Sequence, residues 1–387
     1  MRYFDHIPAD QRELLFSREP EPFGPDSEPL ILATALGATL YSPADRPQLA
    51  QDVQKLAVRG VTSMVLCLED SIADSNLAAA ERNLVHHLEV LAEVRAPLPQ
   101  LFVRVRTADQ IDALVRDLGP AARVLSGFVL PKFVEEDGPG ASEAVIAASE
   151  RVERHLWVMP VLESGNLIGV DTRADALVGI RGVLHKYRPH VLAVRIGGTD
   201  LSSYFGIRRS RDLSIYDILP VAAVIGDIVS VLGRTDGEGF VVTGPVWEYF
   251  ASGERLLKPL LRQSPFAAHR EEPLRARLIE ANLDGLIREV LLDQANGLTG
   301  KTVIHPSHVA AVHALSTVPY EEYQDALSVL STCETGGGVS ASTYRNKMNE
   351  GKPHRTWAAR VIRLARVFGV TRPEVGAVDV LAASATP

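Results

Sequence analysis

The chain has little of several residue types that mark other classes of protein. Only two of its 387 residues are cysteines, Cys67 and Cys333, and they are too far apart in sequence to give a metal-ligand spacing. So few cysteines favour a reducing compartment, which we take to be the cytoplasm. No apolar run approaches the ~18 residues of a membrane span. The first residues, MRYFDHIPADQRELLF, carry acids and lack the apolar core of a signal peptide. We therefore expect a cytoplasmic protein that enters no membrane.

Basic residues are also fewer than acidic residues. The chain has 40 Lys and Arg against 48 Asp and Glu, a formal net charge of -8. Nucleic acid binding needs a basic surface, so this balance argues against a nucleic acid partner. A local group of arginines would still bind a small anionic substrate. Hydrophobic residues make up 46% of the chain and charged residues 23%, which indicates a globular protein with a large core.

Short apolar runs alternate with helix-length segments from Leu30 onward. Most runs are continuously apolar, which is typical of parallel strands covered by helices. No G-x-G-x-x-G follows the first run, which argues against a doubly wound sheet. We predict an α/β fold, a (β/α)₈ TIM barrel, for which ~250 residues are typical. The eight runs are 30–41, 61–69, 101–106, 125–133, 156–164, 191–198, 239–247 and 300–306.

The barrel is expected to span residues 30–318, with amphipathic helices that include 46–60 and 141–156. Residues 1–29, rich in proline and acids, are predicted to form an N-terminal arm. Residues 319–387 are predicted to be a helical C-terminal extension that acts as a lid or a subunit-docking arm. Its helices are expected at 319–333 and 354–368, followed by a loose tail.

Three charged residues stand where catalytic groups of such barrels are found, at the C-terminal ends of strands. Glu69 and Asp70 end the second run, and Arg104 lies between two valines in the third. An arginine inside an apolar strand needs a buried anion or a place in the barrel mouth. A structural ion pair with Glu69 or Asp70 is the alternative, and an acid after a strand also serves as a helix cap.

A second group follows the fifth and sixth runs. Glu163 and Asp200 offer two hard oxygen ligands, and Mg²⁺ commonly binds through one or two carboxylates with water and substrate oxygens. Gly197, Gly198 and Thr199 would let a substrate carboxylate or phosphate approach the backbone, unless they only form a tight turn.

These residues predict metal-assisted chemistry on a small anionic substrate. Arg104 would bind a substrate oxygen and stabilise a developing enolate. Lys132, after the fourth run, offers a metal-free alternative in which it forms a Schiff base. His305, at the end of the eighth run, is a further candidate acid or base, although lone histidines are more often structural.

Seven motifs together resemble the HpcH/HpaI aldolase / citrate lyase β-subunit superfamily over residues 30–312, and most closely its citrate lyase β-like branch. The C-terminal tail resembles a branch found beside tellurium-resistance and stress gene clusters. The motifs, in order, are YSPADRP, LCLEDSIAD, FVRVR, VLPKF, VLESGN, RIGGTDLSSYFG and GLTGKTVIHPSHV.

The resemblance implies a (β/α)₈ barrel, trimeric or hexameric, that binds Mg²⁺ and forms or cleaves C–C bonds. It implies that Glu163 and Asp200 are the metal ligands and that Arg104 binds an acyl oxygen or carboxylate. Glu69 and Asp70 would be the acid pair beside them. Arg46 would lie in the loop that contacts the acyl or CoA part of the substrate.

The sequence departs from that pattern after the seventh run. An acidic residue is expected there, but Thr243 and Trp247 stand near the position in VVTGPVWEY, and an atypical segment follows at 253–273. We therefore predict a Mg²⁺-dependent C–C lyase or aldolase acting on a 2-oxo acid or acyl ester. The alternatives are a malyl- or citramalyl-CoA type lyase, and a metal-binding or ligand-binding barrel without turnover.

The C-terminal extension carries a local excess of positive charge around Arg345 and Lys347. We hypothesise that this stretch covers the barrel mouth of its own or a neighbouring subunit and contacts an anionic substrate such as a phosphorylated compound. The alternative is a solvated stretch that docks subunits in a homo-oligomer.

Overall fold

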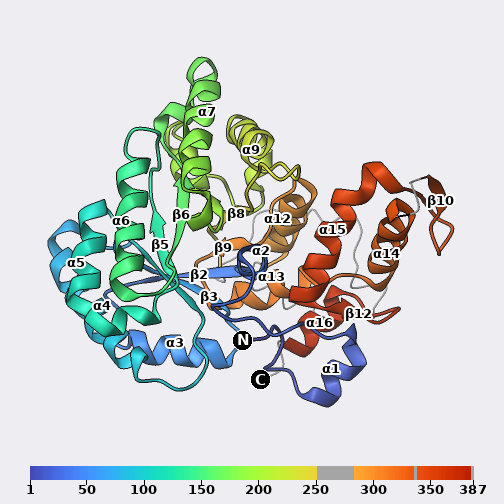
Figure 1. The fold of residues 1–387 in the computed structure, drawn as a ribbon, viewed down its shortest axis with the longest axis horizontal. Helices are drawn as coiled ribbons and strands as arrows, with labels where there is room; N and C mark the ends of the chain where they lie inside the picture. Colours follow the sequence, from blue (N-terminus) through green and yellow to red (C-terminus); the bar gives the residue numbers. More distant parts are fainter. Residues whose placement is uncertain (251–282, 335–337, 385–387) are drawn as a thin grey trace.

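Eight parallel strands close into a barrel in the computed structural model, which describes residues 1–250, 283–334 and 338–384 (Figure 1). Each predicted apolar run contributes one strand, so the TIM-barrel prediction is confirmed. The atypical segment 253–273 lies outside the described residues. In barrel order the strands are β2 (Ala38–Pro43), β3 (Ser63–Cys67), β4 (Gln100–Arg104), β5 (Gly127–Leu130), β6 (Trp157–Leu162), β7 (Val194–Ile196), β8 (Val242–Trp247) and β9 (Lys301–Val303).

Helices surround the barrel on its outer side (Figure 1). They bury one apolar face against the strands: α5, for example, buries Ile111, Leu114, Val115 and Leu118. The helices predicted at 46–60 and 141–156 are confirmed as α3 and α6. The surrounding helices are α3 (Leu49–Val58), α4 (Leu77–Ala92), α5 (Ala108–Leu118), α6 (Gly138–Val152), α7 (Val170–Lys186), α8 (Gly198–Ser203), α9 (Leu219–Leu232), α12 (Asp284–Ala295) and α13 (Val309–Leu315).

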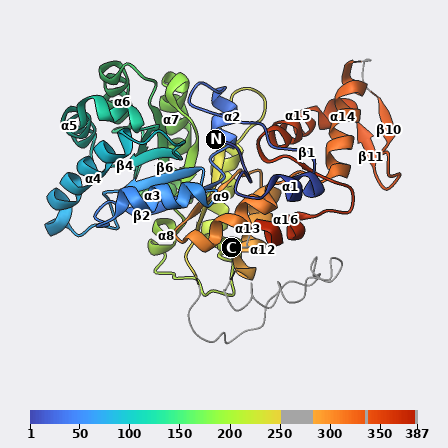
Figure 2. The ribbon, with the colours of Figure 1, turned by 90° about the horizontal axis from the view of Figure 1, so that it is seen from below.

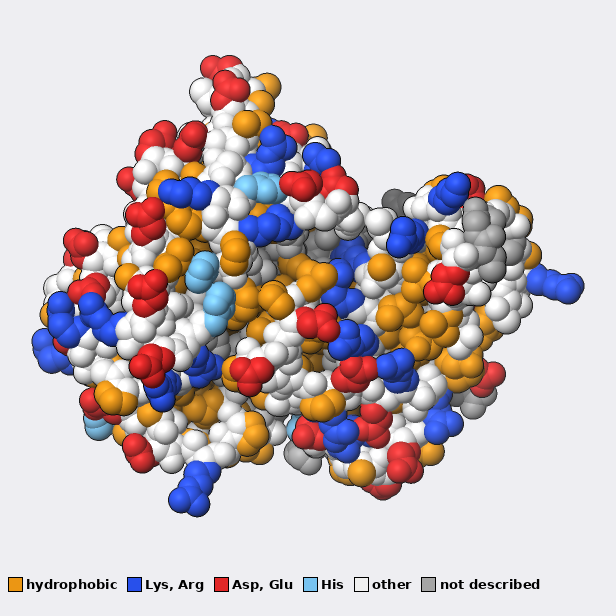
Figure 3. Space-filling view, viewed as in Figure 1, with side chains coloured by type: hydrophobic (Ala, Val, Ile, Leu, Met, Phe, Trp, Pro, Cys, Tyr) orange, Lys and Arg blue, Asp and Glu red, His pale blue; other side chains and the backbone are white. Residues whose placement is uncertain are grey.

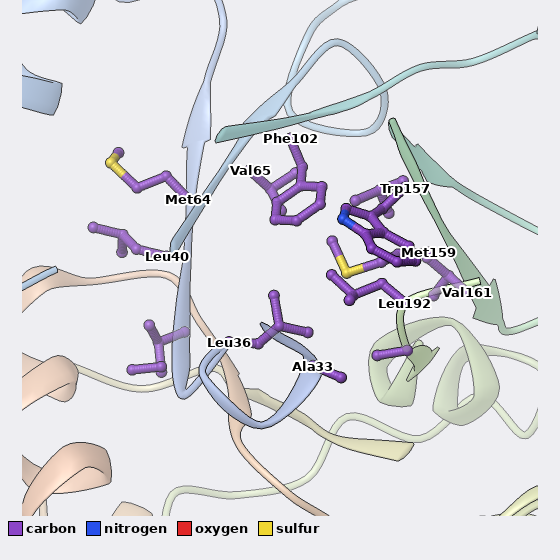
Figure 4. Packing of buried hydrophobic residues seen from close by; sticks show 14 of the residues in the cluster. Ala33, Leu36, Leu40, Met64, Val65, Phe102, Trp157, Met159, Val161 and Leu192 are labelled. Carbon is purple, nitrogen blue, oxygen red and sulfur yellow. The ribbon is translucent and has the colours of Figure 1, made fainter. Parts of the chain in front are cut away.

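Apolar side chains from several strands fill much of the barrel interior. Val65, Phe102 and Met159 come from three different strands and lie close together there (Figure 4). The strands also approach closely at Gly127, where a Cβ atom would lie 2.0 Å from the carbonyl oxygen of Trp157. Only glycine fits that position, so the pairing of β5 with β6 depends on it.

The prediction for the first apolar run was wrong in its first half. Residues Pro29–Thr34 form a helix, α2, and the strand begins only at Ala38. A buried helix and a buried strand both give a continuous apolar run, so the sequence pattern did not separate them.

The N-terminal arm packs against the barrel end at which the strands begin. It contains α1 (Ala9–Leu15) and β1 (Phe16–Arg18). Tyr3 is fully buried, and its hydroxyl donates a hydrogen bond of 2.9 Å to the carbonyl of Ala35, just ahead of β2. The ring of Tyr3 meets His313 of α13 edge-on, with centroids 4.7 Å apart. The buried aromatic side chain of Tyr3 therefore holds the arm, whose sequence is mostly polar, against the barrel.

The C-terminal extension consists of α14 (Tyr320–Glu334), β10 (Val339–Ala341), β11 (Met348–Glu350), α15 (Gly351–Phe368), β12 (Val370–Thr371) and α16 (Ala377–Ser384). The two predicted helices are confirmed as α14 and α15. The expectation of a loose tail was wrong, because β12 pairs with β1 of the arm and α16 packs into the main core.

The extension lies beside the barrel end opposite the mouth (Figure 2). Helix α15 packs on α2, and Arg360 donates a hydrogen bond of 2.7 Å to the carbonyl of Leu298, ahead of β9. Lys and Arg side chains gather where the barrel meets the extension on the face seen in Figure 3. Within the described ranges, no helix combines the length and the apolar character needed to cross a membrane.

Candidate active site

Three predicted carboxylates converge on Arg104 at the C-terminal end of the barrel. Arg104 is the last residue of β4. Its Nη2 lies 2.7 Å from Glu69, 2.9 Å from Glu163 and 3.4 Å from Asp70. Burial works to lower the pKa of Arg104, but Glu163 and Glu69 outweigh it, so the pKa is raised and the guanidinium stays charged. The Nε of Arg104 is buried and has no hydrogen-bond partner among the described residues.

Lys132 joins the same group from the loop after β5. Its Nζ lies 2.9 Å from Glu69 and 3.8 Å from Asp70, while its backbone N–H donates to Glu163 at 3.1 Å. The hydrogen bond to Glu69 raises the pKa of Lys132. A Schiff base requires a neutral amine, so this environment opposes the metal-free alternative.

Glu69 and Asp70 occupy different environments although they are adjacent in sequence. The side chain of Glu69 is 8% exposed and holds both Arg104 and Lys132, whereas that of Asp70 is 55% exposed. Burial would raise the pKa of Glu69, but the hydrogen bond from Asp70 and the cations lower it. Burial and the Glu69 charge raise the pKa of Asp70. Glu69 is thus the fixed anion of the pair, and Asp70 is the accessible carboxylate.

The carboxylate of Glu163 occupies space that a side chain at position 197 would fill. A Cβ atom on Gly197 would lie 2.0 Å from Oε2 of Glu163. Oε1 of Glu163 accepts from Arg104 and Lys132, so Oε2 is the oxygen that faces Gly197. Burial, and then the charge of Asp200, raise the pKa of Glu163 to about 7.

Asp200 lies in the first turn of α8, directly after the glycines that end β7. No group of three or more His, Cys, Asp or Glu ligands occurs among the residues that the structure describes. Two carboxylates with water are a usual environment for Mg²⁺, and a cation between them would relieve the repulsion that Glu163 feels from Asp200. The donor set therefore fits the predicted magnesium ion, and the assignment of Glu163 and Asp200 as its ligands stays a prediction.

An acid, Glu248, directly follows the seventh barrel strand. Strand β8 ends at Trp247, so Glu248 is the first residue beyond it. Its carboxylate accepts 2.7 Å from the hydroxyl of Thr199 and lies 3.4 Å from Nε of Arg209. The sequence interpretation named Thr243 and Trp247 near this position and passed over Glu248. The predicted run and β8 both end at Trp247, so considering the residue directly after the run, as was done for Asp70, would have found Glu248.

Three other predicted residues have contacts outside this group. Arg46, after β2, pairs with Asp52 and is half exposed. His305 caps the short turn after β9, since its Nδ1 accepts from the N–H of Ser307 at 3.2 Å. Gly198, the first residue of α8, packs on Pro245.

Arg345 and Lys347 lie in the C-terminal extension rather than over the mouth of their own barrel. Lys347 pairs with Glu321 at 2.9 Å and Asp325 at 2.7 Å, both in α14. Within one chain the structure does not bring these cations to the carboxylates. Contact with a neighbouring subunit stays a prediction.

The sequence interpretation also passed over Arg195, in the middle of β7. The argument applied to Arg104, an arginine within an apolar strand, applies equally to VLAVRIGG and would have found it.

Comparison with known proteins gives one family match. The model of the C–C bond lyase family of the TIM-barrel fold matches residues 30–370. A citrate lyase from Burkholderia xenovorans LB400 shares the fold with a TM-score of 0.55 and 18% identity, over 90% of this chain and 96% of that one. Protein CitE from Mycobacterium tuberculosis, in complex with magnesium, acetoacetate and coenzyme A, has a TM-score of 0.51 and 21% identity, over 85% and 97%. Among curated proteins, no relative matches.

Proposed function

We propose that this chain, which belongs to the family of C–C bond lyases of the TIM-barrel fold, is a magnesium-dependent lyase or aldolase that acts on a 2-oxo acid or acyl ester. The observation that carries the proposal is the convergence of Glu69, Asp70 and Glu163 on Arg104, with Asp200 beside Glu163. When bound by Glu163 and Asp200, magnesium would supply Lewis-acid polarisation of the substrate oxo group.

Arg104 suits the stabilisation of an enolate. When the C–C bond breaks, its electron pair moves into the carbonyl of the fragment that becomes the enolate, and charge develops on that oxygen. A guanidinium that is already oriented by carboxylates stabilises this charge without reorganising. The unpartnered, buried Nε of Arg104 supports this role, because it is a donor that lacks an acceptor.

Asp70 suits proton transfer. In the cleavage direction the hydroxyl of the other fragment gives up its proton as its carbon becomes a carbonyl, and a carboxylate accepts that proton. Asp70 is the more accessible acid and is held only at 3.4 and 3.8 Å by the cations, while Glu69 is held at 2.7 and 2.9 Å. In the condensation direction the same proton returns to the new hydroxyl.

We also propose that the chain works as a homo-oligomer in the cytoplasm. Lys347 is engaged by α14 within its own chain, and Arg345 lies in the same extension, so a role for them at a barrel mouth requires a neighbouring subunit.

The test combines magnesium titration with a turnover assay. Calorimetry measures the Mg²⁺ Kd, and NMR follows product release from a panel of 4-hydroxy-2-oxo acids and 3-hydroxyacyl esters, including CoA thioesters. We expect turnover of a free acid that EDTA stops and Mg²⁺ restores. Arg104→Gln should lower kcat roughly 10²–10³-fold, the cost of losing one oxyanion donor, without weakening Mg²⁺ binding, because it removes a positive charge beside Glu163. Arg116→Gln, whose parent side chain is 63% exposed, is the control.

Several results would overturn the proposal. If Glu163→Gln and Asp200→Asn both bind Mg²⁺ as the wild type does, the metal assignment fails. If Mg²⁺ binds but no acid in the panel turns over, a barrel without catalysis is favoured. Inactivation by borohydride with pyruvate would favour a Schiff base at Lys132.

A further inference from the structure

Four arginines are buried in the described part of the chain, and only Arg195 has no carboxylate partner there. Arg12 pairs with Glu19, Arg173 with Asp227, and Arg209 with Glu289 and Glu248. A buried guanidinium without a counter-charge is costly, which is why buried arginines are normally paired. The exception calls for an anion from outside the chain.

Arg195 extends into the barrel interior and is 1% exposed. Its Nη2 donates to the hydroxyl of Thr302 at 2.6 Å, and its Nη1 to the hydroxyl of Thr39 at 3.3 Å. The guanidinium carbon lies 5.4 Å from the centre of the Tyr41 ring. The Nε is buried and has no partner among the described residues. These contacts come from neutral groups, and no carboxylate of the described residues forms an ion pair with the guanidinium.

Two of the groups around Arg195, on β2 and β9, are partly accessible. Lys301 and Val303 point outward and are fully buried, so Thr302 between them faces inward. Nevertheless Thr302 and Tyr41 are only half-buried, and the hydrogen bond from Arg195 to Thr302 is partly accessible. Two of the groups that contact the guanidinium are therefore accessible, although the guanidinium itself is buried.

The charges above Arg195 do not supply its counter-ion. Glu69, Asp70 and Glu163 contact Arg104 or Lys132, and the charge of Asp200 acts on Lys132 and Glu163. These four acids and two cations would be brought to neutrality by one divalent cation. The charge of Arg195 is additional. A ligand with one negative charge beyond the metal site would match it.

We propose that Arg195, Thr302 and Tyr41 form a carboxylate subsite at the floor of the barrel mouth. A carboxylate fits better than a phosphate, because a single guanidinium offers one charge in a fork geometry and the strand amides are used in the ladder. Resting on the proposed function, this assigns a substrate whose carboxylate lies deeper in the barrel than the bond that breaks, with its oxo group at Glu163 and Asp200.

The test measures carboxylate binding without magnesium or turnover. The full chain in EDTA is titrated with acetate at constant ionic strength, and the Kd is obtained from the rise in unfolding temperature. Acetamide, which has the same shape but no charge, is the ligand control. The variants are Arg195→Met and Arg195→Lys, with Arg116→Met as the matched surface control.

We expect acetate, but not acetamide, to raise the unfolding temperature of the wild type and of Arg116→Met. Arg195→Met should weaken acetate binding roughly tenfold to a hundredfold, as for loss of a charge-assisted hydrogen bond. Its ligand-free unfolding temperature should not fall, because the substitution removes an unpaired buried charge. Arg195→Lys keeps the charge but loses the fork, so it should bind acetate several-fold more weakly than the wild type.

Equal acetate affinity in the wild type and the Arg195 variants, or no response of the wild type, would overturn the subsite. A lower ligand-free unfolding temperature with an unchanged acetate response would show a purely structural role instead. If Arg195→Met does not fold, the acetate affinity of Arg195→Lys relative to the wild type decides whether the subsite exists. Because no magnesium is present, failure here leaves the lyase proposal intact, and absence of turnover leaves the subsite intact.

Discussion

The position of Glu163 is set by the space above Gly197. The carboxylate occupies the volume that a Cβ atom would take, 2.0 Å from Oε2. We predict that Gly197→Ala displaces Glu163 and raises the Mg²⁺ Kd about 10–100-fold, as is typical when a group that orients a metal ligand is altered. Calorimetric titration of Mg²⁺ measures this change.

Gly226→Ala is the matched control, since a Cβ atom there meets no atom within 4 Å and the position is inside helix α9. It should leave the Mg²⁺ Kd unchanged. Equal Mg²⁺ affinity in both variants would show that Gly197 does not position Glu163.

At the residue scale, the sequence predicted site residues where a charged residue stands at the end of a predicted strand. Glu69, Asp70, Glu163 and Arg104 were selected on that basis, and the structure places them within one ion-pair group. Glu248 was missed although the predicted run ends at Trp247, where β8 also ends, because the residue just beyond the run was not considered. The partners of a side chain depend on which strands are neighbours in space, so the pairing of Lys132 with Glu69 was beyond a linear pattern.

Helix α13 joins the barrel through two histidines that are kept neutral. His313 accepts from the N–H of Ala38 at 3.2 Å, and His308 bonds to the carbonyl of Tyr249 at 3.0 Å. Burial lowers the pKa of His308 to about 4 and that of His313 to about 3, with smaller contributions from His305 and His6. Both pKa values lie below the ordinary 6.5 of the unfolded chain.

These shifts predict that the protein loses stability in mild acid. Below pH ~6.5 the two histidines bind protons in the unfolded chain but stay neutral in the native state. The free energy of unfolding therefore falls as the pH drops toward about 4. Each histidine contributes on the order of 1.4 kcal/mol per pH unit in that window. Urea unfolding at a series of pH values between 7 and 5 measures the slope.

His313→Gln isolates one of the two contributions, because glutamine still offers an acceptor to Ala38 but does not titrate. The slope of stability against pH should fall by about one proton relative to the wild type. An unchanged slope would show that His313 is already protonated in the native state.

At the scale of elements, continuous apolar runs predicted every barrel strand, because strands buried on both faces require such runs. They did not predict α2, whose helix lies within the first run. Strand β12 has two residues and exists through pairing with β1, more than 350 positions earlier in the chain. No local pattern encodes such a partner.

The arm, the barrel and the extension pack against one another at the barrel end where the strands begin. Tyr3 contacts the extension as well as the barrel, since its ring centroid lies 4.5 Å from that of Phe368 in α15. We predict that Tyr3→Ala lowers the free energy of unfolding by about 3–5 kcal/mol, the usual cost of removing a large buried aromatic side chain. Urea unfolding followed by fluorescence and circular dichroism measures it.

Tyr344→Ala is the control, because Tyr344 is 47% exposed in the extension. Its effect should stay within about 0.5 kcal/mol. A loss below about 1 kcal/mol for Tyr3→Ala would mean that the arm contributes little to the stability of the whole.

The pairing of β1 with β12 has a consequence for the order of events during synthesis. The arm is translated before the barrel, but its partners Phe368 and β12 are translated after the barrel. The contact of Tyr3 with Phe368 and the pairing of β1 with β12 can therefore form only once the barrel strands have been made. A nascent chain stalled before residue 368 would leave part of the aromatic surface of Tyr3, Phe4 and Phe16 open to chaperones.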